Sequence, residues 1–376
     1  MKTHLKKLLP LVGVVSCFSS SLLLAASHYG GSGNDACCPP KKPEPVCAEP
    51  CNEEVTRMKV FEECKYREIT PDAGPRVACG TDFFITADFI YWATRMDGLG
   101  YAATNIAGVN VPQGSVSHPD FGWEPGFKVG LGYNLPHDGW DVFVEYTYLR
   151  PSADDSTTNN TNRMVRLWAD PTNNPFETVS SARANWDFDL NVIDLELGRN
   201  FFVSRYLTLR PFFGLKGAWT SSSFTIRTVD ALDSTLGDVV AMGQDFWGVG
   251  FRTGMNTVWW FNKYFGIFGD FALSALWGDF DVTRRDANTI TVNNVVTETT
   301  TSNTKNCFSS MKPVFEIAMG LEGDYWFSDD QYHFGAKLGW EMQYWANQNQ
   351  FFSLNEEGSH GDLSFMGLTL RFRFDF

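Results

Sequence analysis

The sequence predicts an all-β protein that crosses a membrane as an up-and-down antiparallel β-barrel of about ten strands. Apolar and polar residues alternate in repeated segments, the links between these segments are long and short in turn, and aromatic residues make up 15% of the 376 residues. In a membrane barrel the apolar face of each strand meets lipid and the polar face lines the lumen. Mean hydropathy is only −0.21, and no internal apolar run reaches about 18 residues, which excludes a helical membrane protein.

Residues 1–26 have the pattern of an export signal peptide. Three lysines lie within the first seven residues, an apolar stretch covers 8–15, and Ala25 and Ala26 provide small residues for cleavage. A second interpretation is a lipoprotein site at Val14-Val15-Ser16-Cys17, with the lipid on Cys17. Both interpretations take the chain out of the cytoplasm.

Residues 27–80 form a Cys- and Pro-rich segment that we expect to be periplasmic. It has too few large apolar residues to build a core, although 52–69 could form a short helix. Its cysteines are candidates for disulfides: Cys37, Cys38, Cys47, Cys51, Cys64 and Cys79. Their spacing does not match a metal site. With Cys307 the mature chain has an odd number of cysteines, so the segment is either a disulfide-pinned linker or a cross-link to another envelope protein.

Residues 81–376 contain the predicted barrel. Its ten segments are 82–92, 122–133, 140–148, 184–200, 205–220, 244–260, 263–278, 310–327, 331–345 and 362–376. The odd-numbered links are long (95–121, 149–183, 221–243, 279–309 and 346–361), and the even-numbered links are the short stretches NLPHDG, VSR, FNK and SDDQ. The Thr- and Asn-rich stretch 289–301 could add a hairpin and give twelve strands. In outer-membrane barrels long loops face outside and short turns face the periplasm, which would place both chain ends in the periplasm of a Gram-negative cell.

The last segment ends in the alternating sequence LTLRFRFDF. Its apolar residues would face lipid and form the signal read by the outer-membrane assembly machinery: Leu368, Leu370, Phe372, Phe374 and Phe376. Its charged residues would face the lumen.

Three stretches resemble the Legionella-type major outer membrane protein family, which also has similar members in environmental chlamydiae. They are FITADFIYWATRMDGLGYA (84–102), GFKVGLGYNLPHDGWDVFVEYTYL (126–149) and FDLNVIDLELGRNFFVSRYLTLRPFFGLKGAW (188–219). The resemblance implies a pore-forming barrel without a catalytic site. The Cys-rich segment departs from the family pattern and suggests an envelope strengthened by disulfides between proteins.

Alternation predicts the residues that face the lumen. Three strands carry a lysine between small residues, and the expected pore-lining set is Asp88, Lys128, Glu145, Glu196, Arg210, Lys216, Asp270, Glu316, Lys337, Glu341, Arg371 and Arg373. Unpaired charges in a dry lumen would be very costly, so either the lumen is wet or the charges form a packed network. Small residues beside each lysine favour water. Acidic and basic residues on opposite walls, with carboxylates in excess, would give a mild preference for cations.

The predicted function is that of a porin-like protein through which ions and small hydrophilic solutes diffuse passively. The alternative is a structural or adhesive protein, cross-linked in the envelope, with a closed lumen. An enzyme is disfavoured: His118 with Asp120 and His360 with Asp362 lie in outer links, but no GxSxG, HExxH or Walker motif occurs. A net charge of −14 argues against nucleic acid. Outer-membrane lipid is an expected partner, a homo-oligomer is compatible with the sequence, and no cofactor is implied.

Overall fold

The computed structural model describes residues 81–104, 114–135, 139–159, 164–168, 178–293, 295–328, 331–353 and 360–376. The expected signal peptide, the possible Cys17 lipid site, the short helix at 52–69 and the six clustered cysteines lie outside these ranges. The described ranges contain strands and turns but no helix, and therefore no helix that could span a membrane.

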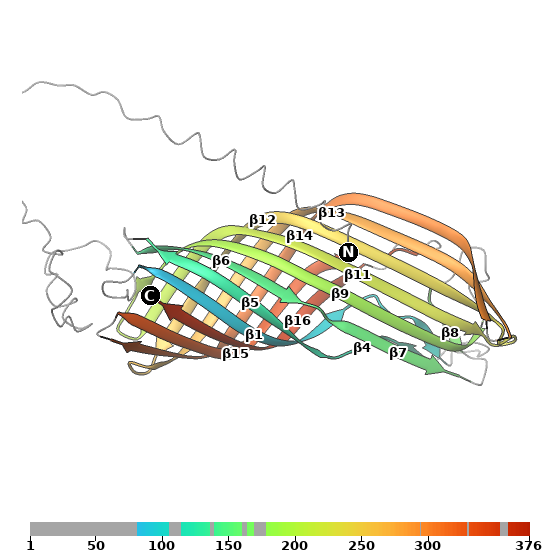
Figure 1. The fold of residues 1–376 in the computed structure, drawn as a ribbon, viewed down its shortest axis with the longest axis horizontal. Helices are drawn as coiled ribbons and strands as arrows, with labels where there is room; N and C mark the ends of the chain where they lie inside the picture. The colour runs from blue at the N-terminus through green and yellow to red at the C-terminus, as the bar shows by residue number, and fades with distance from the viewer. Residues whose placement is uncertain are drawn as a thin grey trace, which may run out of the picture. The chain divides into compact units, whose positions relative to one another are not determined.

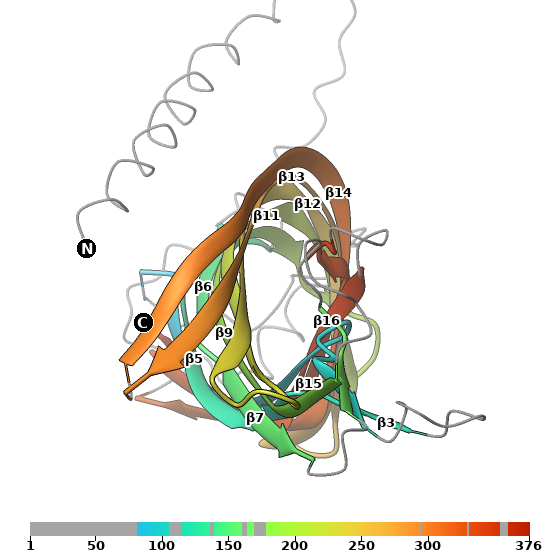
Figure 2. The same ribbon diagram turned by 90° about the vertical axis from the view of Figure 1, so that its right-hand side faces the viewer.

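Ten long strands of the described residues close into one antiparallel ring (Figures 1 and 2). They are β1 (Phe83–Met96), β5 (Trp123–Asn134), β6 (Trp140–Leu149), β9 (Thr178–Arg199), β11 (Leu207–Asp230), β12 (Leu236–Trp260), β13 (Phe265–Val292), β14 (Val295–Phe327), β15 (Tyr332–Asn349) and β16 (Gly361–Asp375). Each pairs with the next long strand, and β16 pairs back onto β1 with Arg371 opposite Asp88. The prediction of an up-and-down barrel of about ten strands is confirmed.

Shorter strands extend the sheet at its two ends. They are β2 (Ala102–Thr104), β3 (Ser115–Ser117), β4 (Asp120–Phe121), β7 (Ser152–Thr158), β8 (Met164–Arg166) and β10 (Phe201–Phe202). β7 and β8 pair with the first half of β9, and β2 joins β8 to β3. β10 pairs with β11 at the opposite end. The first half of β9 therefore has partners that the barrel ring alone would not provide.

The outer surface carries an apolar belt of membrane height. On β13 the outward side chains from Phe265 to Trp277 are apolar, and Asp279 begins a polar outer surface. This stretch covers about 40 Å of strand, or about 30 Å of thickness at a tilt of about 40°. Rings gather at both edges, including Tyr91 stacked on Trp123 at a centroid distance of 5.6 Å. The belt marks the part of the barrel that crosses the membrane.

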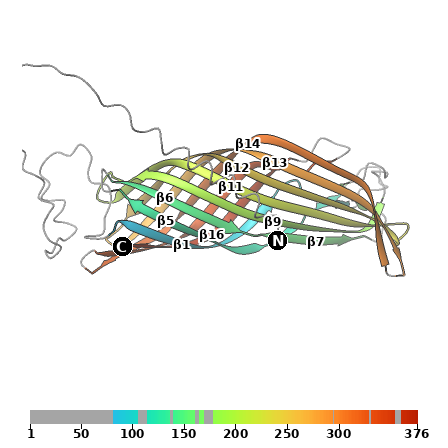
Figure 3. The ribbon, with the colours of Figure 1, turned by 45° about the horizontal axis from the view of Figure 1, so that its top comes forward.

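The polarity of the two faces is inverted above the belt. On β9 the outward residues Ile193 and Leu195 belong to the belt, and Asp194 between them points inward. Towards the start of the same strand the inward residues become apolar, as at Trp186 and Phe188, while Asp187 faces out. The longest strands, β9 and β11 to β14, therefore have the pattern of a membrane barrel at one end and that of a water-soluble barrel at the other, and Figure 3 shows how far they extend.

Two of the segments that were expected to be long links are mostly strand. Much of 221–243 and 279–309 continues β11, β12, β13 and β14 beyond the belt. The stretch 289–301 forms the tip of the β13–β14 hairpin, with Val292 opposite Val295, and adds no strands to the ring. These segments were expected to be loops because their outer faces are polar, but their inner faces are apolar and pack together.

The short turns and the described chain ends lie at the same end of the barrel. Ser204 Oγ accepts hydrogen bonds from the backbone N–H groups of Tyr206 and Leu207 in one turn, at 3.2 and 3.1 Å. The N–H of Thr81 donates to the carbonyl oxygen of Phe376 at 3.2 Å. The five apolar residues of the final ladder point away from the lumen, and the ring of Phe374 stacks on Tyr332 at a centroid distance of 6.0 Å.

Candidate functional site

The half of the lumen nearest the short turns is lined by charged side chains. The structure places all twelve expected pore-lining residues here: Asp88, Lys128, Glu145, Glu196, Arg210, Lys216, Asp270, Glu316, Lys337, Glu341, Arg371 and Arg373. Eleven of them border a cavity of about 260 Å³, and Asp88 lies behind Arg371. The charged side chains pair with one another and also border an open space, so the structure contains both a packed network and a cavity large enough for water.

Each lysine of the three Gly-Lys-Gly-like strands has a carboxylate partner. Lys128 Nζ lies 2.6 Å from Glu341, and Lys216 Nζ lies 2.9 Å from both Asp194 and Glu316. An aromatic ring lies beside each ammonium as well: Trp92, Trp345 and Phe268 are 5.0, 5.9 and 5.1 Å from the nitrogens of Lys128, Lys216 and Lys337. Carboxylate and ring together replace much of the water that a buried ammonium gives up.

Arginine side chains link carboxylates on different strands. Arg371 binds Asp88 at 2.7 Å and also contacts Glu145. Arg210 binds Asp141 at 2.5 Å and Glu196 at 3.0 Å. A guanidinium has five donors in a fixed plane, so it can bridge two carboxylates.

Several residues of this network were absent from the predicted pore-lining set. They are Asp141, Asp194, Arg252, Asp324 and His333, whereas Asp375 was expected to face the lumen as a charged residue of the final ladder. Alternation could have found Asp141 and Asp194, because each lies on the same face as Glu145 or Glu196. Arg252 lies in the glycine-rich part of the predicted segment 244–260, on the face opposite to Val249 and Phe251, so alternation could have found it as well.

His333 lies between two carboxylates near the short-turn end. Its Nδ1 is 2.7 Å from Asp375 and its Nε2 is 3.2 Å from Asp324. The ring stacks on Trp326 at 4.3 Å, and Arg373 holds Asp375 from the other side at 2.6 Å. Asp324, His333 and Asp375 lie on β14, β15 and β16, and only the pairing of these three strands brings them together. The sequence of a single strand therefore could not identify this cluster.

Acidic and basic residues alternate around the ring rather than occupying opposite walls. Basic residues gather on β5, β15 and β16 and again on β11 and β12, while the strands between them are mainly acidic. Among the described residues, the charged half of the lumen carries eleven carboxylates: Asp88, Asp141, Glu145, Asp194, Glu196, Asp270, Glu316, Glu322, Asp324, Glu341 and Asp375. The same half carries seven lysines and arginines: Lys128, Arg210, Lys216, Arg252, Lys337, Arg371 and Arg373. The excess of four carboxylates makes this half of the lumen negative when His333 is neutral.

The glycines beside the lysines do not leave open space. A Cβ atom added at Gly130 would lie 2.6 Å from the ring of Phe143, and one at Gly339 would lie 2.6 Å from Phe268. Aromatic rings from other strands therefore cover these glycines, an arrangement known as aromatic rescue. The expectation that these small residues make room for water is wrong at both positions.

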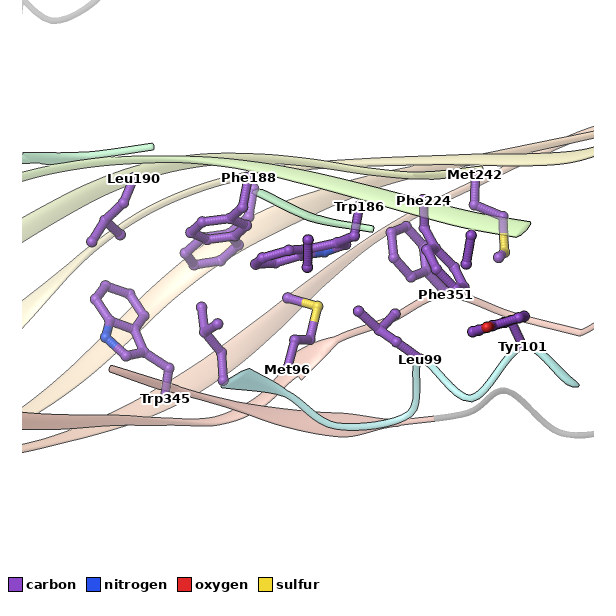
Figure 4. Packing of buried hydrophobic residues seen from close by; sticks show 14 of the residues in the cluster. Met96, Leu99, Tyr101, Trp186, Phe188, Leu190, Phe224, Met242, Trp345 and Phe351 are labelled. Atoms are coloured by element: carbon purple, nitrogen blue, oxygen red, sulfur yellow. The ribbon is translucent and has the colours of Figure 1, made fainter. Parts of the chain in front are cut away.

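An apolar layer fills the lumen beyond the charged half. Figure 4 shows side chains from facing walls pointing toward one another, among them Phe188, Trp186 and Phe224 on one side and Trp345 and Met96 on the other. Trp186 and Phe188 stack at a centroid distance of 5.6 Å. All five residues are at most 2% exposed. Above the layer, burial raises the pKa of Tyr101, whose hydroxyl donates to Asp155 at 2.9 Å.

The histidine and aspartate pairs considered for catalysis are not joined within the described chain. No hydrogen bond links His118 to Asp120 or His360 to Asp362 among the residues with described placement. Asp362 instead accepts hydrogen bonds from the Tyr344 hydroxyl and from the Asn347 N–H, the latter at 2.7 Å. Across the described ranges, no group of three His, Cys, Asp or Glu residues is arranged to hold a metal ion.

Comparison with solved structures finds other barrels at low similarity. The outer membrane protease OmpT from Escherichia coli is 10% identical, with a TM-score of 0.40, covering 79% of this chain and 98% of its own. The P. putida toluene transporter TodX is 9% identical, with a TM-score of 0.31, covering 82% and 91%. The outer membrane protein OprG from Pseudomonas aeruginosa is 8% identical, with a TM-score of 0.27, covering 78% and 96%. Similarity this low says nothing about what the chain does.

Comparison with sequence families gives a direct assignment. No curated protein matches the chain. The model of the Legionella pneumophila major outer membrane protein precursor family matches residues 77–376, which include all the described strands. The apolar belt, the closed ten-stranded ring and the charged inner face are features expected of such a protein. The chain belongs to this major outer membrane protein family.

Proposed function

We propose that the protein is a narrow outer-membrane channel through which cations and small hydrophilic solutes diffuse, and that the structure shows its closed state. The observation that carries this proposal is the cavity of about 260 Å³ bordered by charged side chains in the half of the lumen nearest the short turns. The excess of carboxylates would concentrate cations there.

The energetics of burial support a transport role for the charges. Replacing a buried ion pair by packed apolar residues is often neutral or stabilising, so a barrel that needed only to be stable would gain little from this network. The same barrel uses apolar filling in its other half, around Trp186 and Phe224. The change from charged to apolar filling supports separate roles for the two halves: a hydrated vestibule and a closure that excludes water.

We further propose the usual orientation for such a barrel. The short turns and both chain ends would face the periplasm, and the extended hairpins would face outside. The vestibule would then open toward the periplasm. The final ladder from Leu368 to Phe376 would be the part recognised by the assembly machinery, and the clustered cysteines would bond to one another or to other envelope proteins.

The test is a single-channel recording of the purified full-length protein in a planar bilayer under a salt gradient. Discrete steps with a reversal potential on the cation side are expected. A reversal potential on the anion side would contradict the charge argument. A silent bilayer from a barrel whose gel migration shows that it is folded would contradict the channel itself.

The second candidate is a structural surface protein with a permanently closed lumen. The apolar layer favours it, because residues such as Trp92, Trp345 and Phe365 are at most 1% exposed. A non-enzymatic role is common to both candidates, and the use of Asp362 to hold backbone and tyrosine groups supports it. Persistent silence in the bilayer, together with disulfide-linked multimers in non-reducing gels of whole envelopes, would favour this candidate.

A further inference from the structure

The last part of β15 leaves the barrel wall and enters the lumen. Pairing with β16 is regular up to Trp345 opposite Leu363, then breaks, and resumes only at Asn349 opposite Gly361. Within the break Asn347 has a φ of 58°, a left-handed conformation that turns the chain inward. We name residues 347–352 the strap.

Residues 348–351 of the strap are buried inside the barrel although three of the four are polar. Gln348, Asn349 and Phe351 are 0% exposed, and Gln350 is 7% exposed. The ring of Phe351 stacks on Phe224 of β11 at a centroid distance of 6.1 Å (Figure 4). The strap is thus part of the apolar layer that closes the lumen.

Side chains of three other strands hold the strap in place. Gln244 Nε2 donates to the carbonyl oxygen of Gln348 at 2.8 Å, and Gln244 Oε1 accepts from the N–H of Gln350 at 2.7 Å. Gln348 Nε2 donates to Thr220 Oγ1 at 3.2 Å, and Lys312 Nζ donates to the carbonyl oxygen of Asn347. Gln244 therefore grips the strap backbone at two points.

Most of these contacts differ from those that hold the barrel together. The sheet is stabilised by backbone ladders, whereas the strap is bound mainly by side chains from β11, β12, β13 and β14, among them Arg284, whose Nη1 donates to the carbonyl oxygen of Phe352 at 3.0 Å. The strap's own links to the sheet edge are the pairing of Asn349 with Gly361 and the hydrogen bond from Asn349 Nδ2 to the carbonyl oxygen of Asp97 at 2.9 Å. The strap could therefore leave its seat by giving up these two links, without breaking any pairing of β11, β12, β13 or β14. One atom of the seat is also unsatisfied: Gln348 Oε1 is buried and has no hydrogen-bond donor among the described residues. Water would satisfy it once the strap moved.

We propose that the strap is a movable closure of the lumen and that Gln244 is its latch. When the strap is seated, Phe351 completes the apolar layer, and the vestibule has no open path to the outer half of the barrel. When it is released, the amide groups of Gln348, Asn349 and Gln350 become hydrated and a polar path joins the vestibule to the outer half of the barrel. This inference rests on the proposed channel function.

The experiment compares the full-length protein with Gln244→Ala. The variant loses both hydrogen bonds to the strap backbone, and we expect the open fraction in bilayer recordings to rise about thirtyfold, which corresponds to about 2 kcal/mol. Chymotrypsin followed by mass spectrometry reports the position of the strap independently, because cleavage after Phe351 or Phe352 requires the strap to be exposed. We expect protection in the unmodified protein and cleavage in the variant.

Two further variants keep the result interpretable. Gln244→Met keeps most of the side-chain volume and loses both hydrogen bonds, so its open fraction should rise as that of Gln244→Ala does. Asn262→Ala is the matched control, since Asn262 Oδ1 also binds two backbone N–H groups, of Tyr264 and Phe265, but in a short turn at the other end of the barrel. It should behave like the unmodified protein. Heat-modifiable gel migration shows whether each variant has folded.

The outcomes separate the strap from the channel. If Gln244→Ala is cleaved at the strap but conducts as the unmodified protein does, the strap is not the closure, and the channel proposal stands. If the strap is cleaved and neither protein conducts, both proposals fail. If the strap stays protected in folded Gln244→Ala, Gln244 is not a latch and the inference is wrong.

Discussion

Replacing Lys216 by methionine tests how dry the charged half of the lumen is. The Lys216 side chain is 1% exposed and its ammonium lies 2.9 Å from both Asp194 and Glu316. Methionine fills a similar volume but leaves the two carboxylates with one cation fewer. Glu316 keeps Arg252 at 2.6 Å, whereas Asp194 keeps Arg252 only at 3.8 Å. Removing one partner of a buried ion pair lowers the free energy of unfolding by about 3–5 kcal/mol. Because Arg252 remains beside both carboxylates, we expect a loss of about 3 kcal/mol for Lys216→Met.

The assay is equilibrium unfolding by urea in lipid vesicles, followed by tryptophan fluorescence. Lys305→Met is the control, because Lys305 pairs with Asp281 at 2.6 Å on the outer surface, where its side chain is 57% exposed. The control should lose less than about 1 kcal/mol. Adding Asp194→Asn to Lys216→Met removes the stranded charge and should recover at least about 1 kcal/mol. A loss for Lys216→Met as small as that of the control would refute the reasoning and show that water screens the network.

Three further predictions concern selectivity, the membrane belt and pH. Asp270 borders the cavity without an ion-pair partner within 4.0 Å among the described residues, so Asp270→Asn should shift the reversal potential toward anions without lowering the free energy of unfolding. Phe271→Arg places a charge in the outward belt and should destabilise by about 2–4 kcal/mol in vesicle unfolding, whereas Asp279→Arg, above the belt, should cost almost nothing. A hydrogen bond from Arg227 lowers the pKa of Glu298, which lies outside the membrane. The stabilisation that ionised Glu298 gives the folded protein is therefore present above about pH 4.3 and is lost as the pH falls through the lowered pKa. Glu298→Gln should lack this acid-dependent loss in urea unfolding.

The ring of strands was predictable because the membrane imposes one rule on every strand. Within the belt, side chains such as Phe271 and Leu273 must be apolar, so their period of two stands out in the sequence. The same rule located the inward charges, including Lys128 and Glu341, before their partners were known. Which charge pairs with which could not be predicted, since Lys128 and Glu341 lie on strands whose pairing partners do not include each other.

The outer half of the barrel was harder to predict because its rule is reversed. From Ser221 onward β11 has small polar residues outside and Phe224 and Ile226 inside, which is the pattern of a soluble sheet. The alternation with apolar residues on the outer face, which predicted the strands, therefore ends at the edge of the belt. The strap was invisible for a different reason: Gln348 and Gln350 have the composition of a loop, and only the tertiary structure shows that they are buried.

The inversion of polarity along β9 and β11 to β14 also fixes the alignment of neighbouring strands. A slip of one residue would turn every side chain of a strand to the other face. In a simple membrane barrel such a slip would place side chains in the wrong environment only within the membrane. Here the slip would place Asp194 in lipid and would also place Trp186 in water. A slip of two residues keeps the faces but moves the switch from charged to apolar filling by about 7 Å relative to the adjacent strands. The point at which polarity inverts must therefore lie at the membrane surface on every one of these strands. A barrel with a shifted strand register would be destabilised both inside the membrane and above it.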